Sequence, residues 1–123
     1  MTVRYRDPNA RVIVEIEPAA VWALLDESYR RVKAWRDWEL PHQAREPLRR
    51  VVQRAPETVG AWLRVYRIEM SYQPAEALRH RSDELGDALQ RMPDQVERDT
   101  GAALKRAARA FYEVIRVPRR VPR

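Results

Sequence analysis

Apolar and polar residues alternate between residues 11 and 17, where Val12, Val14 and Ile16 share one side. A period of two is typical of a strand with one buried face. A single strand needs a partner for its backbone N–H and C=O groups. We therefore expect this strand to pair either with the β-favouring residues 114–117 or with another chain.

The next two segments follow the helical period and are bounded by prolines. Pro18 stands where a first-turn proline belongs and opens a helix that we expect to reach about residue 39. Its apolar residues recur every three or four positions, as an amphipathic helix requires: Trp22, Leu25, Tyr29, Val32 and Trp35. Pro47 is expected to open a short helix that ends before Pro56.

Three further helices are expected in the second half of the chain. Residues 57–72 are apolar nearly all round, which indicates the central and most buried helix. Pro74 opens a helix to about residue 92, and a last helix follows Pro93 to about residue 115. In this last helix we expect Val96 and Phe111 to face inward.

These elements predict a mainly all-α protein: a compact four- to five-helix bundle with one short N-terminal β-strand. The length of 123 residues fits a single domain, with a flexible arm at residues 1–10 and a basic tail at residues 117–123. The longest apolar run, residues 18–25, is far shorter than the ~20 residues that span a bilayer. With no cysteine and no signal-peptide pattern, we expect a cytoplasmic protein.

The charge of the chain indicates a binding function in addition to a fold. The net charge is +6, with 22 arginines and only two lysines. Residues 1–56 carry +3, residues 57–97 carry −3 and residues 98–123 carry +6. Arginine suits phosphate because its planar fork donates two parallel hydrogen bonds. A genome rich in G and C also favours arginine codons, which explains the Arg:Lys ratio but not the net charge.

We therefore expect a non-catalytic subunit that binds the backbone of RNA or DNA. It would belong to a larger assembly with other protein subunits, in which homo-oligomers of the chain are also possible. In size, helix content and basicity the chain is similar to the small helical subunits of CRISPR effector complexes. Trp38, which with Trp35 flanks Arg36 and falls off the apolar stripe of its helix, is the candidate for base stacking. The expected contact residues lie on the last helix, in the tail and on the short helix: Arg98, Lys105, Arg109, Arg116, Arg119, Arg120, Arg123, Arg45, Arg49 and Arg50.

An alternative is a structural or adaptor protein of a multi-protein assembly such as a phage particle. The N-terminal strand could then add to a partner's sheet, and the basic tail could bind a second partner. The acidic middle of the chain between basic ends also fits self-association.

Catalytic and metal sites are not expected. Glu76, His80 and Glu84 share a helical face, which is typical of a solvated face with local ion pairs as well as of a metal site. Arg36 and His42 have the spacing of the Arg–His pair of the HEPN ribonucleases, a resemblance that implies RNA cleavage by an acid–base pair. With 22 arginines this spacing easily arises by chance, so we expect His42 to be a surface residue. No cofactor is expected.

Overall fold

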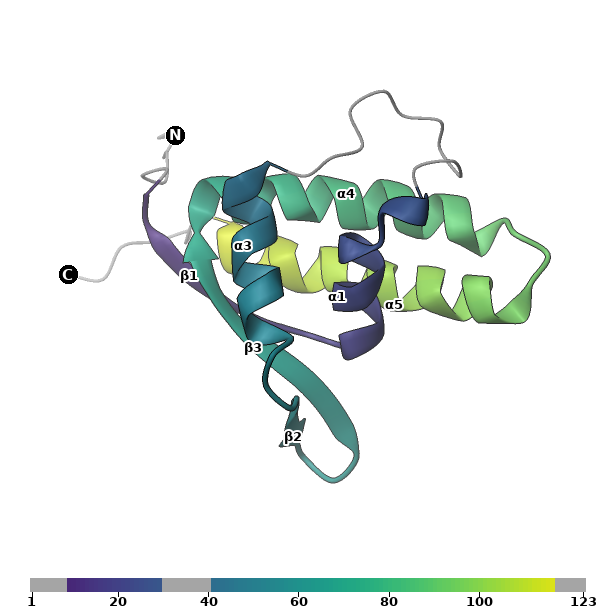
Figure 1. The fold of residues 1–123 in the computed structure, drawn as a ribbon, viewed down its shortest axis with the longest axis horizontal. Helices are drawn as coiled ribbons and strands as arrows, with labels where there is room; N and C mark the ends of the chain where they lie inside the picture. The colour runs from purple at the N-terminus through teal and green to yellow at the C-terminus, as the bar shows by residue number, and fades with distance from the viewer. Residues whose placement is uncertain (1–8, 30–40, 117–123) are drawn as a thin grey trace, which may run out of the picture.

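The computed structural model describes residues 9–29 and 41–116 (Figure 1). They form a three-stranded antiparallel sheet and four α-helices. In chain order the elements are β1 (Arg11–Ile16), α1 (Pro18–Leu25), the 3-10 turn η1 (Glu27–Tyr29), α3 (His42–Val51), β2 (Glu57–Val59), β3 (Leu63–Ser71), α4 (Tyr72–Gln90) and α5 (Gln95–Ile115). The predicted all-α bundle is therefore wrong in one respect: the fold is mostly helical but includes a small sheet.

The sheet has the strand order β1-β3-β2, so β3 is its central strand. The pairing of β1 with β3 runs from Arg11 opposite Ser71 to Ile16 opposite Tyr66. The predicted strand is thus confirmed. Its partner is β3 of the same chain, so the prediction that it pairs with the C-terminal segment is wrong. Residues 114–115 instead end helix α5.

The predicted central helix at residues 57–72 is the main error, because these residues form the β2–β3 hairpin. Tyr66, Ile68 and Met70 are buried on one face of β3, while Arg67 and Glu69 are exposed on the other. This is alternation with a period of two, which the surrounding apolar residues obscured. Gly60 takes a φ of 65° in the turn between β2 and β3, a conformation that a helix interior does not contain.

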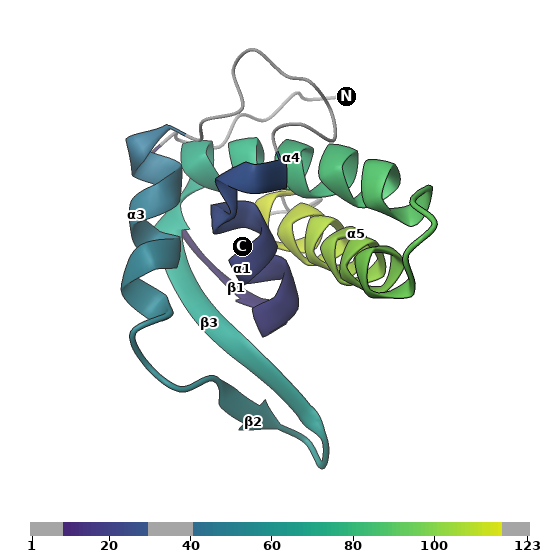
Figure 2. The ribbon, with the colours of Figure 1, turned by 45° about the vertical axis from the view of Figure 1, so that its right-hand side comes forward.

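The helices cover one face of the sheet, as Figures 1 and 2 show. The inner faces of β1 and β3 contact α1, α4 and α5, and α3 lies along β3. Fully buried side chains from every helix fill the space between these layers: Val21, Leu48, Leu78, Leu85, Leu89, Leu104 and Phe111. Phe111 was expected to face inward and does so, whereas Trp22 and Val96 are 54% and 70% exposed.

Helices α4 and α5 form a close antiparallel pair that permits no side chain at two glycines. A Cβ on Gly101 would lie 2.8 Å from the carbonyl oxygen of Gly86, and a Cβ on Gly86 would lie 3.0 Å from the carbonyl oxygen of Gly101. Asp94 caps α5 by accepting a hydrogen bond from the backbone N–H of Glu97 at 3.1 Å. Two of the predicted helices, after Pro74 and after Pro93, are thereby confirmed within a few residues.

The first two predicted helices are corrected by local hydrogen bonding and by proline position. Helix α1 ends at Leu25, because the Asp26 carboxylate accepts from the N–H and the hydroxyl of Ser28, at 2.9 and 2.7 Å, in a local turn that competes with the helix. The rest of the expected helix, residues 30–39, lies outside the described residues. Helix α3 begins at His42 rather than Pro47, which lies inside it.

Candidate nucleic-acid interface

Positive charge gathers on one part of the fold. The described residues contain 15 basic and 15 acidic side chains, so the excess of six charges belongs to residues 1–8, 30–40 and 117–123. Within the described residues, 42–67 hold six arginines and two glutamates, for a net charge of +4, and the remainder is −4. We call residues 42–67, which form α3, the following turn and most of the hairpin, the basic half.

Three arginines of the basic half are free of carboxylate partners. The side chains of Arg49, Arg54 and Arg64 are exposed and form no hydrogen bond or ion pair in the part of the chain that the structure describes. Arg50 lies 3.7 Å from Glu46, at the outer limit of an ion pair. Free guanidinium groups keep all their N–H donors available for phosphate oxygens.

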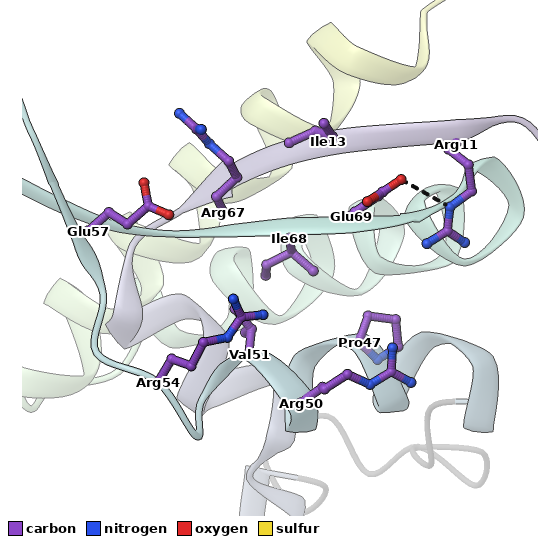
Figure 3. Close-up of a pocket in the computed structure, with 10 residues that line it drawn as sticks. All are labelled: Arg11, Ile13, Pro47, Arg50, Val51, Arg54, Glu57, Arg67, Ile68 and Glu69. Atoms are coloured by element: carbon purple, nitrogen blue, oxygen red, sulfur yellow. Dashed lines mark hydrogen bonds and ion pairs between the residues drawn. The ribbon is translucent and has the colours of Figure 1, made fainter.

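A groove runs between α3 and the outer face of the sheet. It consists of two adjoining hollows of about 320 and 300 Å³, which share Arg11, Pro47, Arg50 and Glu69. Figure 3 shows Arg50 and Arg54 on the α3 side of β3 and Arg11 and Arg67 on the strands. We call the two hollows together the arginine groove and define it by four residues of its lining: Arg11, Arg50, Arg54 and Arg67.

Two of the groove arginines are held by carboxylates across the sheet. Arg67 donates to Glu15 at 2.8 Å, and this hydrogen bond, with the charges of Glu57 and Glu15, raises the pKa of Arg67. Arg11 donates to Glu69 at 3.5 Å and to the Ser71 hydroxyl at 3.3 Å. Exposed pairs of this kind contribute little to stability, and Arg54, which lines the same hollow, forms no ion pair among the described residues.

The tip of the hairpin carries the most exposed large apolar side chain among the described residues. Trp62 is 90% exposed and follows Gly60 and Ala61 in the turn. The hairpin projects beyond the described helices in both views (Figures 1 and 2), and the exposure of Trp62 shows that none of these helices covers its ring. Leu63 beside it is 51% exposed.

The arginines and lysine that we expected on the last helix are mostly engaged within the fold. The Arg98 guanidinium donates to the carbonyls of Met92 and Pro93 and so closes the α4–α5 turn. Lys105 lies between Asp83 and Asp87, whose hydrogen bonds raise the pKa of its ammonium group against partial burial.

At the end of the same helix, Arg116 pairs with Glu113 at 3.3 Å and its guanidinium lies 6.0 Å from the centre of the Tyr112 ring. Arg109 alone of the four expected residues on this segment is exposed without a partner among the described residues.

The other expected contact residues divide into three groups. Arg50 lines the arginine groove, whereas Arg45 and Arg49 lie on α3 outside its lining. Trp38, Arg119, Arg120 and Arg123 lie outside the described residues. Sequence reasoning missed Arg11, Arg54, Arg64, Arg67 and Trp62. The assignment of residues 57–72 to a helix hid the alternation that sets Arg67 beside Glu15 and the turn that carries Trp62. Arg11 reaches the groove through the pairing of β1 with β3, which was not predicted.

The described residues form no cluster of three or more metal-ligating side chains. His80 instead lies 3.4 Å from Glu76, which also accepts from Arg79 at 3.1 Å, so this face of α4 has local ion pairs. His42 is an exposed first residue of α3, and Arg36 lies outside the described residues. No described helix is both long and apolar enough to cross a membrane.

Neither a protein-family model, nor a curated protein, nor a solved structure matches the chain.

Proposed function

We propose that this protein binds the phosphate backbone of a nucleic acid through its basic half, as a non-catalytic component of a larger assembly. The observation that carries the proposal is the gathering of unpaired arginines, Arg49, Arg54 and Arg64, on α3, the following turn and the hairpin, in a fold whose described residues outside the basic half carry a net charge of −4. Cations without carboxylate partners retain their full attraction for phosphate, whereas those held in ion pairs must first be released.

The shape of the basic half supports the same proposal. The arginine groove offers guanidinium groups on both of its sides, and Ile68 and Val51 close its floor. A backbone lying in such a groove would exchange its counterions for arginine side chains, so binding would weaken steeply with salt. Contacts of this kind fix the position of a nucleic acid without reading its sequence.

The adaptor alternative loses one of its supports. That hypothesis used an N-terminal strand without a partner, whereas β1 pairs along its whole length with β3. The +6 carried by residues 1–8, 30–40 and 117–123 adds further attraction for a polyanion, whatever the partner of the basic half.

A charge-reversal comparison tests the proposal by fluorescence anisotropy with labelled single-stranded RNA, single-stranded DNA and duplex DNA. Arg54→Glu with Arg64→Glu removes two unpaired arginines from the basic half. Arg91→Glu with Arg109→Glu is the matched control, since both residues are exposed and unpaired among the described residues but lie in α4–α5.

We expect the first variant to lose at least about tenfold in affinity at ~50 mM salt, and the control to lose less than about threefold. The opposite ranking would move the interface to α5, where the sequence placed it. Absence of binding in the parent protein to all three probes would refute the proposed function, and degradation of the labelled strand would refute its non-catalytic character.

A further inference from the structure

The tip of the β2–β3 hairpin is a separate feature from the arginine groove. Trp62 exposes 90% of its surface and is the largest apolar group that the described fold leaves uncovered. Burying a tryptophan side chain ordinarily stabilises a protein by more than any other single apolar contact. A ring left in water at a projecting turn is therefore available for contact with a partner.

The backbone around Trp62 presents the ring rather than folding it back. Gly60 has a φ of 65° and nothing within 4 Å of the position of a Cβ, so the turn is tight and open on its outer side. Leu63 begins β3 directly after Trp62, and the pairing of Val59 with Leu63 fixes the base of the turn. The ring is thus carried on a hydrogen-bonded ribbon and not on a loose loop.

An exposed arginine whose side chain has no partner among the described residues, Arg64, lies close to Trp62 along the chain. Arg64 follows Trp62 by two residues and pairs with Thr58 at the start of β3, and two residues of chain span at most about 7 Å between Cα atoms. An aromatic face with a guanidinium group beside it is the combination that binds a base together with its phosphate.

We propose that the ligand is single-stranded nucleic acid and that an unpaired base stacks on the indole ring of Trp62. This inference rests on the nucleic-acid binding proposed above. The bases of a duplex are already stacked on one another, so a single exposed ring gains a full face only from an unpaired base. The neighbouring Arg64 then binds the adjoining phosphate. Since stacking involves the face of any base, the preference would be for single strands and not for a sequence.

The test compares Trp62→Ala and Trp62→Phe with Trp22→Ala, a control in which a half-exposed tryptophan of α1 is removed. Affinity is measured for an oligo(dT) strand and for a duplex of the same length. We expect Trp62→Ala to lose about tenfold for the single strand, in the range of roughly 5- to 150-fold that one base–aromatic stack supplies, and less than about twofold for the duplex. Trp62→Phe and Trp22→Ala should stay within about threefold of the parent.

A second readout follows the ring itself. Titration of unlabelled oligo(dT) should quench tryptophan emission in the parent, and this quenching should largely disappear in Trp62→Phe although that variant still binds. Unchanged single-strand affinity in Trp62→Ala would overturn the inference while the proposed function stands. An equal loss of affinity for the single strand and the duplex would also overturn it, because it indicates a side chain wedged into a base step of the duplex. Self-association that disappears in Trp62→Ala, with nucleic-acid binding intact, would assign the tip to protein contact and overturn it too.

Discussion

The basic half and the α4–α5 pair use charged residues in opposite ways. In α4–α5, Lys105 is held by Asp83 and Asp87, and Arg98 is bound to backbone carbonyls. In the basic half, Arg49, Arg54 and Arg64 point to solvent without partners among the described residues. A cation that is already satisfied stabilises the fold, whereas a cation that is not satisfied remains available to a ligand. The number of arginines in an element therefore does not indicate where a polyanion binds.

The two regions should respond very differently to a methyl group at a glycine. Gly101→Ala places its Cβ 2.8 Å from the Gly86 carbonyl oxygen and 2.9 Å from the Gln90 backbone nitrogen, so α4 and α5 must move apart. We expect the free energy of unfolding to fall by about 3 kcal/mol, as measured by urea denaturation. A loss below about 0.5 kcal/mol would show that the helices separate readily.

The matched change in the hairpin is Gly60→Ala. Nothing lies within 4 Å of the new Cβ, but the φ of 65° is unfavourable for alanine. We expect a loss of about 1 kcal/mol in unfolding free energy from this backbone cost. The same denaturation experiment serves, and a loss as large as that of Gly101→Ala would contradict the view that the hairpin tip is open.

The pairing of Lys105 predicts a loss of stability at high pH. Its folded-state pKa is raised above the ordinary value of 10.5 by Asp83 and then Asp87. A raised pKa means that the contribution is complete below 10.5 and is lost as pH rises through the folded-state value. Parent protein and Lys105→Met should therefore differ in urea midpoint at pH 8 and converge as the pH rises past the folded-state pKa of Lys105. A difference that persists at high pH would contradict the role of this ammonium group.

The smallest effect on stability is expected where the effect on binding is largest. Arg54→Gln with Arg64→Gln removes no hydrogen bond or ion pair among the described residues, so the unfolding free energy should change by less than about 0.5 kcal/mol. Thermal denaturation beside the parent checks this. A larger loss would mean that these arginines stabilise the fold. It would contradict the contrast between the basic half and the α4–α5 pair.

Sequence reasoning was most reliable where one period dominated. The strand at β1 and the helices α4 and α5 were predictable, because alternation or helical spacing is clear and prolines mark the starts. The hairpin was missed because Val59, Trp62, Leu63, Tyr66 and Met70 also fit helical spacing, so a short apolar run reads both ways. The turn at Gly60 and the alternation of residues 66–70 were the signals that would have distinguished a hairpin from a helix.

The candidate site was less predictable than the fold for a physical reason. Whether an arginine is free depends on carboxylates far along the chain: Arg67 meets Glu15 across the sheet, and Arg106 of α5 meets Glu17 at 2.6 Å. That hydrogen bond raises the pKa of Arg106. Such pairs follow from topology, and the topology was misread once residues 57–72 were assigned to a helix.

The most direct test of the account is the salt dependence of binding to a single strand, measured for the parent, for Arg54→Gln with Arg64→Gln and for Arg91→Gln with Arg109→Gln. Each lost phosphate contact should reduce the slope of log affinity against log salt by about 0.7. The account predicts a slope shallower by about 1.4 in the first variant and unchanged in the second. An unchanged slope in the first variant, or an equal change in both, would contradict the claim that the basic half binds the backbone.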